Sequence, residues 1–229
     1  MHHEPLLQLE KVSRHFREGG RDHIVLSDLD LEIPKGQLLV LLGRSGSGKS
    51  TLLNLLAGID LPNRGRILLD GTDLTALDEH RRTLLRRYRI GFVFQFFNLI
   101  PTLTVEENLL LPLELAGTLG PEDRQRADDL LEQVGLADRR SSFPDVLSGG
   151  EQQRIAIARA LVHDPSLILA DEPTGNLDAD TAEGVLDLLV GTLRKAGKTL
   201  VMATHSREVA SLADRVLRVQ DGRLVEVEV

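Results

Sequence analysis

Residues Gln37 to Leu56, QLLVLLGRSGSGKSTLLNLL, join a continuous apolar run to a glycine-rich loop and then to a leucine-rich segment. An unbroken apolar run is typical of a strand that is buried on both faces of a parallel sheet. The leucine-rich segment after the loop has the pattern of a helix. This stretch therefore predicts a strand–loop–helix unit, the building block of an α/β fold.

The loop itself, GRSGSGKST, follows the pattern G-x-x-x-x-G-K-[ST]. Its glycines let backbone N–H groups point at phosphates. Lys49 would supply charge to the β and γ oxygens, and the Ser50 hydroxyl would bind Mg²⁺. A loop that is merely flexible would not require a lysine and a serine, Lys49 and Ser50, at this fixed spacing after the glycines. The sequence therefore predicts a nucleotide site made by Gly43, Ser45, Gly46, Ser47, Gly48, Lys49, Ser50 and Thr51.

Other segments predict two kinds of strand around this unit. Apolar and polar residues alternate in Leu6–Phe16, in Ile24–Ile33 and around a turn at Asp70-Gly71, as in half-buried antiparallel strands. Continuous apolar runs at Ser166–Ala170 and Thr199–Thr204 predict further strands of a parallel sheet. The fold class is therefore expected to be α/β.

The remaining segments predict a hairpin and a helical section. Residues 215–229 are expected to form a hairpin that turns at Asp221-Gly222. Between Phe96 and Gly149 the pattern changes to helix, and we interpret this section as a lobe inserted into the α/β core. Prolines are expected to punctuate it at Pro101, Pro112, Pro121 and Pro144.

Composition limits the functions that are open. The 229 residues suffice for one large domain or for a domain with an inserted lobe. The net charge of −8 argues against sequence-independent binding to nucleic acid, which needs a positive face. The absence of cysteine excludes disulfides and thiolate metal sites. No apolar run reaches the roughly 18 to 20 residues that cross a bilayer, and the N-terminus lacks the features of a secretory signal.

A second group of candidate residues follows buried strands. Asp171 and Glu172 end the run LILADEP, where Asp171 could hold Mg²⁺ and Glu172 could deprotonate an attacking water. Adjacent carboxylates could simply be solvated, but the phosphate loop favours the catalytic interpretation. His205, at the end of TLVMATH, could hydrogen-bond the γ-phosphate. Gln95, which ends IGFVFQ, could reach both Mg²⁺ and the water.

An arginine-rich segment, EHRRTLLRRYR at Glu79–Arg89, carries five arginines. We interpret it as the solvated face of a helix. Contact with lipid headgroups or with a partner is the alternative.

The stretch LSGGEQQR, Leu147–Arg154, places two glycines before a predicted helix and would expose N–H groups to an anion. This second anion site has no lysine. LSGGEQQR occurs in one chain with GRSGSGKST, FVFQ, LILADEP, GNLD and ATH. With these motifs in their order, nearly the whole chain resembles the nucleotide-binding domain of an ABC transporter.

The resemblance implies a RecA-like P-loop NTPase core with an antiparallel β subdomain and an inserted α-helical subdomain. Residues 1–95 and 155–229 would form the β subdomain and core, and residues 96–154 the helical subdomain. It also implies a Mg²⁺-dependent ATPase whose cofactors are ATP and Mg²⁺. Its catalytic residues would be Glu172, His205, Gln95 and Lys49, and its metal ligands Ser50, Gln95 and Asp171.

In this family two subunits pack head to tail, and each presents its Ser-Gly-Gly segment to the ATP that is held by the other. By that resemblance Ser148, Gly149 and Gly150 contact the partner's ATP, and Glu151 completes the motif. Asp178 resembles the residue that communicates across the dimer, and Phe16 falls where the family stacks a ring on adenine.

Gln95 also resembles the residue that links the nucleotide to the helical lobe and the membrane subunit. Just after it, some of the apolar residues Phe96, Phe97, Leu99 and Ile100 are expected to line a groove for a short permease helix, although part of this segment must be core.

Two departures from the common family pattern refine the resemblance. Gly175-Asn176-Leu177-Asp178 stands where many members have Ser-Ala-Leu-Asp, and Ser206 follows His205 where Asp is common. The first departure resembles the branch of the LolCDE, MacAB and FtsEX ATPases.

That branch implies an ATP-binding subunit that drives a separate inner-membrane permease, with or without a periplasmic adaptor, for lipoprotein release or for export of macrolides, peptides or amphiphiles. The ATPase would lie peripherally on the cytoplasmic side of that membrane. The alternative is an FtsE-like ATPase that controls cell-wall hydrolysis through a membrane partner. A soluble ABC protein acting on DNA or ribosomes fits poorly with the acidic net charge.

Overall fold

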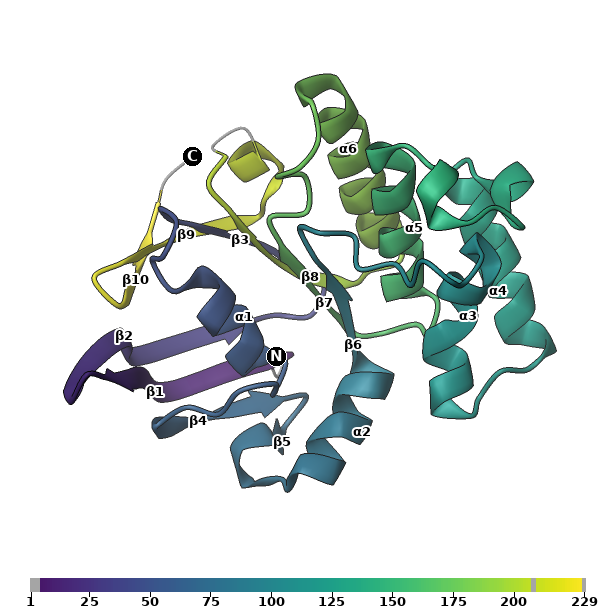
Figure 1. The fold of residues 1–229 in the computed structure, drawn as a ribbon. Helices are drawn as coiled ribbons and strands as arrows, with labels where there is room; N and C mark the ends of the chain where they lie inside the picture. Colours follow the sequence, from purple (N-terminus) through teal and green to yellow (C-terminus); the bar gives the residue numbers. More distant parts are fainter. Residues whose placement is uncertain (1–4, 207–208, 228–229) are drawn as a thin grey trace. The chain divides into compact units, whose positions relative to one another are not determined.

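The computed structural model describes residues 5–206 and 209–227 (Figure 1). The chain forms two compact units. One unit comprises residues 1–86 and 197–229, and the other comprises residues 87–196. The division predicted from the sequence, with a core of residues 1–95 and 155–229 and a helical lobe of residues 96–154, stays a prediction.

An antiparallel sheet forms the N-terminal part of the first unit. Its strands β1 (Leu7–Glu18), β2 (Arg21–Ile33), β4 (Arg64–Leu69) and β5 (Thr72–Asp73) pair in the order β2-β1-β4-β5. The predicted alternation is confirmed, because Leu7 and Leu9 are buried while Gln8 between them is partly exposed. The predicted turn at Asp70-Gly71 joins β4 to β5, and both of its residues have positive φ, as a tight hairpin requires.

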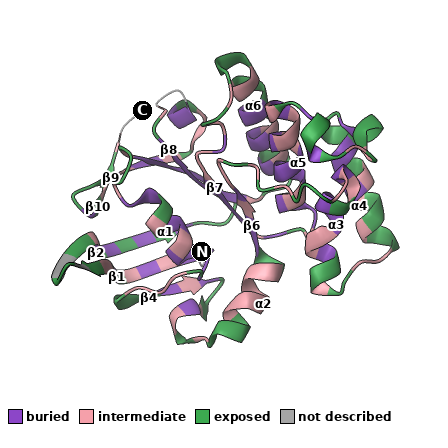
Figure 2. Ribbon diagram, viewed as in Figure 1, coloured by how far each residue is buried: buried purple, intermediate pink, exposed green. Residues whose placement is uncertain are grey.

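A second set of strands in the same unit positions the glycine-rich loop. Strand β3 (Leu38–Leu42) lies between the parallel strands β8 (Thr199–Thr204) and β9 (Arg215–Gln220). Every residue of β3 and β8 is buried (Figure 2), as their unbroken apolar runs predict. Helix α1 (Lys49–Leu56) follows the loop and packs near β8.

The hairpin predicted for residues 215–229 is present in residues 215–226, and residues 228 and 229 of that prediction lie outside the described residues. Strand β10 (Arg223–Glu226) pairs antiparallel with β9 across Asp221-Gly222. A short 3-10 turn, η4 (Val209–Leu212), precedes β9.

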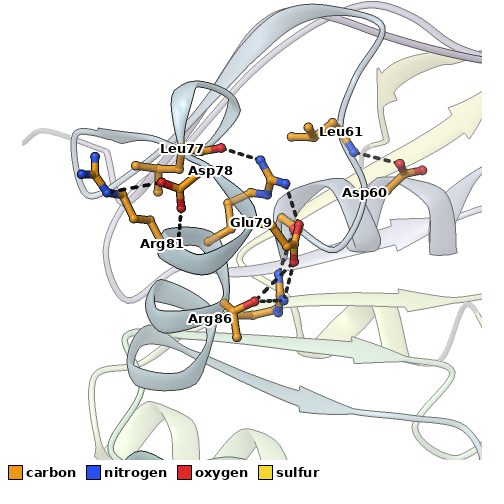
Figure 3. Close-up of polar contacts among 10 residues, drawn as sticks. Asp60, Leu61, Leu77, Asp78, Glu79, Arg81 and Arg86 are labelled. Atoms are coloured by element: carbon orange, nitrogen blue, oxygen red, sulfur yellow. Dashed lines mark hydrogen bonds and ion pairs between the residues drawn. The ribbon is translucent and has the colours of Figure 1, made fainter.

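The arginine-rich helix α2 (Glu79–Arg89) follows the 3-10 turn η1 (Leu74–Ala76). Arg82 donates to the carbonyl oxygen of Leu77 at 2.5 Å and pairs with Glu79 at 2.6 Å. Leu77 and Glu79 are labelled in Figure 3. Arg86 donates to the carbonyl oxygen of Gly58 at 2.8 Å. The solvated face that the sequence predicted therefore applies to the exposed Arg81 and not to Arg82 or Arg86.

The second unit combines two parallel strands with four α-helices. Strands β6 (Ile90–Val93) and β7 (Leu167–Asp171) pair in parallel. The helices are α3 (Val105–Ala116), α4 (Pro121–Gln133), α5 (Gly149–Leu161) and α6 (Ala179–Lys195), with short 3-10 turns η2 (Ala137–Arg139) and η3 (Pro144–Val146). Helix α5 contacts α3, α4, α6 and β6, so it forms the centre of this unit.

The prolines of the helical section behave as predicted except at one position. Pro101 lies in a loop, Pro121 begins α4 and Pro144 begins η3. Pro112 lies inside α3 and does not end it. Leu109, Leu110 and Leu113 are buried around it, and their packing keeps the helix continuous.

The mixed α/β architecture agrees with the fold class that the sequence predicts. No helix within residues 5–206 and 209–227 combines the length and the apolar composition that crossing a membrane requires.

Candidate nucleotide-binding site

The glycine-rich loop lies between β3 and α1, where the sequence predicted it. Gly46 has φ 76° and Gly48 has φ 101°, conformations that favour glycine. Gly48 caps α1 without any side-chain hydrogen bond, and the first turn of α1 carries no acidic residue. Neither the cap nor the first turn of α1 therefore offers a side-chain anion to its first N–H groups, which suits the binding of a phosphate.

Lys49, the first residue of α1, is only 6% exposed. Its Nζ donates to the carbonyl oxygens of Gly43 at 2.9 Å and Arg44 at 3.3 Å. The ammonium group thus lies inside the curve of the loop. A cation held there attracts the anionic phosphates that the loop can surround.

The Ser47 hydroxyl is buried and has no hydrogen-bond partner among the described residues. Its backbone N–H donates to the carbonyl oxygen of Arg44 at 3.1 Å. A buried hydroxyl without a partner costs free energy unless a ligand supplies the missing hydrogen bond. This group therefore marks the inner wall of the loop as a polar binding surface.

A pocket of about 790 Å³ opens in front of the loop. Residues Gly43–Ser47 form one wall, and His205 from the end of β8 lies in the same pocket. Arg44 and Arg218 add positive side chains to the lining. The first unit thus brings together the predicted phosphate loop and the predicted histidine.

Phe16 is placed at the margin of this arrangement. Its ring is 36% exposed, and the guanidinium of Arg14 lies 4.5 Å from the ring centroid. Phe16 is not among the residues that line the pocket, but its β-ladder partner His23 is. Residues that face each other across antiparallel strands project to the same side of the sheet, so Phe16 projects to the same side as His23.

In the second unit Asp171 ends β7 and Glu172 begins a turn. Glu172 has φ 46°, an uncommon left-handed conformation for a residue other than glycine. The turn is closed by a hydrogen bond from the N–H of Gly175 to the carbonyl oxygen of Glu172 at 3.0 Å. Strained backbone of this kind often occurs where a catalytic side chain must be aimed.

Gln95 lies beside this turn. It follows β6, which pairs in register with β7 from Ile90↔Leu167 to Val93↔Ala170. Because the carboxyl ends of parallel strands meet at one edge, Gln95 and the Glu172 turn come together. Gln95 Nε2 donates to Asn176 Oδ1 at 3.3 Å, and Asn176 Nδ2 donates to the carbonyl oxygen of Gln95 at 2.9 Å.

Ser148 and Glu151 form a reciprocal cap at the start of α5. The N–H of Glu151 donates to Ser148 Oγ at 3.3 Å, and the N–H of Ser148 donates to Glu151 Oε2 at 2.8 Å. These hydrogen bonds hold the pKa of Glu151 below its ordinary value. The serine and the glutamate of the LSGGE segment therefore also have a role in the fold.

The two glycines of that segment lie against neighbouring side chains. A Cβ on Gly150 would be 2.4 Å from Thr181 Cγ2 of α6. A Cβ on Gly149 would be 3.3 Å from Leu177 and 3.5 Å from the Phe97 ring. Close packing is thus one reason for glycine at position 150, a reason that the sequence motif does not reveal.

Asp178 caps α6 by accepting a hydrogen bond from the N–H of Thr181 at 3.0 Å. Hydrogen bonds from Thr181 hold the pKa of Asp178 below its ordinary value. The structure thus gives Asp178 a capping role within the chain.

Two side chains of α5, the buried Gln153 and the half-buried Arg159, hold the segment that contains Gln95. Gln153 Nε2 donates to the carbonyl oxygens of Pro173 at 2.5 Å and Phe94 at 3.3 Å. Arg159 donates to the carbonyl oxygens of Asn98 at 2.7 Å and Phe97 at 2.9 Å. Burial lowers the pKa of Arg159. No local sequence pattern marks either residue, because the backbone groups that they bind are distant in the chain.

The chain matches known proteins along nearly its whole length. A family model described as ABC transporter matches residues 26–175. An uncharacterized ABC transporter ATP-binding protein of Mycobacterium tuberculosis is 56% identical over 225 residues, which cover 98% of this chain and 91% of the relative. The lipoprotein-releasing system ATP-binding protein LolD of Pseudomonas syringae pv. tomato is 46% identical over 226 residues, which cover 99% of this chain and all of LolD (100%).

A solved structure agrees with the sequence matches. It is the dimeric post-hydrolysis state of the ATP-binding cassette MJ0796 bound to ADP and Pi. Its TM-score to this chain is 0.88 at 40% sequence identity, and the match covers 97% of this chain and 98% of MJ0796.

The chain belongs to the ABC transporter family. It is an ATP-binding subunit of that family and an ATPase with the P-loop NTPase fold. The predicted family, fold class and ATP hydrolysis are confirmed.

Proposed function

We propose that two copies of this chain bind two molecules of MgATP head to tail and use their hydrolysis to drive a membrane permease. One observation carries the proposal: two helices of the chain begin after glycine-containing segments of different composition. The loop before α1 has Lys49 at its centre, whereas the start of α5 has Ser148 and two glycines but no lysine. The start of α5 could serve ATP hydrolysis if a partner subunit brings the lysine and the nucleotide. MJ0796, with which this chain shares its fold, is described as a dimer.

In the proposed site the residues of the loop, Gly43, Ser45, Gly46, Ser47, Gly48, Ser50 and Thr51, bind the phosphates. Lys49 neutralises charge on the β and γ oxygens. Glu172 accepts a proton from the water that attacks the γ-phosphate, and His205 donates a hydrogen bond to that phosphate. The exposed ring of Phe16 is the proposed contact for adenine.

Mg²⁺ fits the donors that this chain offers. A hydroxyl on Ser50, an amide oxygen on Gln95 and a carboxylate on Asp171 are oxygen ligands, which Mg²⁺ prefers. Among the described residues no cluster of three His, Cys, Asp or Glu side chains could hold a metal by itself. The phosphates of ATP and water would therefore complete the coordination. The ion would neutralise charge that develops on the phosphates during hydrolysis.

The second anion-binding end would act on the partner's nucleotide. Ser148, Gly149 and Gly150 are the proposed contacts, and Glu151 supports them through the reciprocal cap with Ser148. Asp178, at the start of α6, is proposed to communicate between the two sites.

The permease is proposed to dock on the segment after Gln95, with the ATPase on the cytoplasmic side of the inner membrane. Phe96 is 69% exposed and Ile100 is 37% exposed, while Phe97 and Leu99 are half-buried. The similarity to LolD favours lipoproteins or other amphiphiles as cargo, with or without a periplasmic adaptor. It does not favour the FtsE-like alternative.

Replacing Glu172 with Gln tests the catalytic and dimeric parts of the proposal. We expect the variant to bind ATP, to form a stable dimer in analytical ultracentrifugation, and to hydrolyse ATP at least about 100-fold more slowly. Glu183→Gln, at an exposed position of α6, is the matched control and should behave like wild type. Normal turnover in Glu172→Gln would refute the role of Glu172, and an ATP-bound monomer would refute the dimer.

Replacing Phe96 with Asp tests the docking segment. The Phe96→Asp variant should lose the copurifying permease from detergent-solubilised membranes and keep its ATP-dependent dimer. Ile59→Asp, which changes another exposed apolar residue, should keep both. Retention of the permease by Phe96→Asp would place the docking surface elsewhere.

A further inference from the structure

Gln95 and Asn176 are joined by hydrogen bonds in both directions. The Asn176 amide Nδ2 donates to the backbone carbonyl oxygen of Gln95 at 2.9 Å, and the Gln95 amide Nε2 donates to Asn176 Oδ1 at 3.3 Å. Asn176 lies four residues after Glu172, in the GNLD segment where many relatives of this chain have Ser-Ala-Leu-Asp. The pair therefore connects the proposed metal ligand to the turn that carries the proposed catalytic carboxylate.

Gly175 makes room for this pair. A Cβ at position 175 would be 2.9 Å from Gln95 Nε2, 3.3 Å from its Cδ and 3.4 Å from its Cγ. Gly175 does not have a positive φ, so its backbone conformation does not require glycine. Glycine at this position instead leaves room for the Gln95 side chain. A serine at this position, as in many family members, would displace that side chain.

The chemistry of the donors fixes the orientation of both amides. The backbone carbonyl oxygen of Gln95 can only accept, so Asn176 must present its NH₂ group to it. Asn176 then has only its oxygen for Gln95, and Gln95 must present its own NH₂ group in return. The remaining side-chain atom of Gln95 is the oxygen Oε1, which is the atom that a magnesium ion binds.

Buried contacts hold the backbone on both sides of the pair. The side chain of Gln153 is fully buried and donates to the carbonyl oxygens of Phe94 and Pro173. Phe94 precedes Gln95, and Pro173 follows Glu172. Gln153 thus fixes the backbone on both sides of the pair but does not contact the Gln95 side chain in these hydrogen bonds. The orientation of the Gln95 amide therefore depends on its own partner, Asn176.

We propose that Asn176 is a positioning residue, which turns the Gln95 amide so that its oxygen Oε1 faces the magnesium ion. This inference rests on the proposed function, because it takes Gln95 as a metal ligand. Groups that hydrogen-bond a metal ligand orient it, and their removal typically weakens metal affinity by 10- to 100-fold. The pair is exposed, so the lower end of that range applies.

Electron paramagnetic resonance of Mn²⁺ binding measures the effect of Asn176 on metal affinity without turnover. The protein carries Glu172→Gln and is saturated with ATP. Asn176→Ala should weaken Mn²⁺ binding about 10-fold, while metal-free ATP binding, measured by calorimetry in EDTA, changes less than about 2-fold. Asn176→Asp keeps an acceptor for Gln95 Nε2 and should bind Mn²⁺ within about 3-fold of the parent. Circular dichroism checks the fold of each variant.

Gln95→Ala separates this inference from the proposed function. It should weaken Mn²⁺ binding as much as Asn176→Ala does, and the double variant should be no weaker than either single one. If Gln95→Ala weakens binding and Asn176→Ala does not, the positioning role of Asn176 is overturned and the metal role of Gln95 stands. If Gln95→Ala leaves Mn²⁺ binding unchanged, the metal role proposed for Gln95 fails, and the positioning role fails with it.

Discussion

Asn108 of α3 binds the backbone of Ile100 with both ends of its side-chain amide. Its Oδ1 accepts from the N–H of Ile100 at 2.7 Å, and its Nδ2 donates to the carbonyl oxygen of Ile100 at 3.0 Å. The same Nδ2 lies 3.0 Å from the carbonyl oxygens of Leu103 and Thr104. Asn108 is fully buried, so it fixes the loop that connects Gln95 to α3 from inside the unit.

Replacing Asn108 with Ala should lower the free energy of unfolding by about 3 kcal/mol. The substitution removes these hydrogen bonds and leaves the backbone groups of Ile100, Leu103 and Thr104 without their buried partner. Urea denaturation measures the change. Glu114→Ala, at an exposed position of the same helix, is the control and should stay within about 0.5 kcal/mol of wild type. An equally small effect of Asn108→Ala would show that water replaces the amide.

Replacing Gly150 with Ala should destabilise the protein by about 1 to 3 kcal/mol. The new methyl group would meet Thr181 Cγ2, which is 2.4 Å from the ideal Cβ position. Thermal unfolding of the nucleotide-free protein measures this cost without any contribution from ATP.

Thr181→Ser supplies the matching rescue, because it removes Cγ2 and keeps the hydroxyl near Asp178. The variant with both Gly150→Ala and Thr181→Ser should recover most of the lost stability. If stability recovers and ATP-dependent dimerisation does not, Gly150 also acts on the partner's nucleotide. If stability does not recover, the clash is not the cause of the loss.

The cap between Ser148 and Glu151 should make stability depend on pH. The hydrogen bonds from Ser148 lower the pKa of Glu151 in the folded protein below the ordinary value of 4.5. The charged cap therefore contributes its full stability above about pH 4.5, and this contribution is lost as the pH falls through the lowered pKa. Glu151→Gln removes the titration, so the difference in unfolding free energy between wild type and Glu151→Gln should shrink on acidification. A difference that stays constant with pH would contradict the assigned pKa shift.

Arg86 should matter for stability and Arg81 should not. Arg86 donates to the carbonyl oxygen of Gly58, just after α1. The exposed Arg81 side chain pairs with the neighbouring Asp78 at 3.6 Å (Figure 3). We expect Arg86→Ala to cost about 1 to 2 kcal/mol in urea denaturation, and Arg81→Ala less than about 0.5 kcal/mol. If both substitutions change the free energy of unfolding by equally small amounts, Arg86 belongs, like Arg81, to the solvated face that the sequence predicts.

Local patterns in the sequence predicted the strands and the position of the glycine-rich loop correctly. The runs at Gln37–Leu42 and Thr199–Thr204 predicted buried strands because their residues are apolar without interruption. Asp70-Gly71 and Asp221-Gly222 predicted turns because few other residue pairs adopt positive φ easily. Pro112 was misjudged, since the local rule against proline in a helix competes with burial of the leucines around it.

The sequence by itself determined the chemistry of this protein, because the spacing of Gly43, Lys49 and Ser50 and the order of the later motifs depend only on neighbours in the chain. Tertiary structure decided which side chains hold those motifs in place. Gln153, Asn176 and Asn108 bind backbone groups that lie up to 81 residues away in the chain. Hydrogen bonds and close packing act through space, so no local pattern marks these residues before the chain is folded.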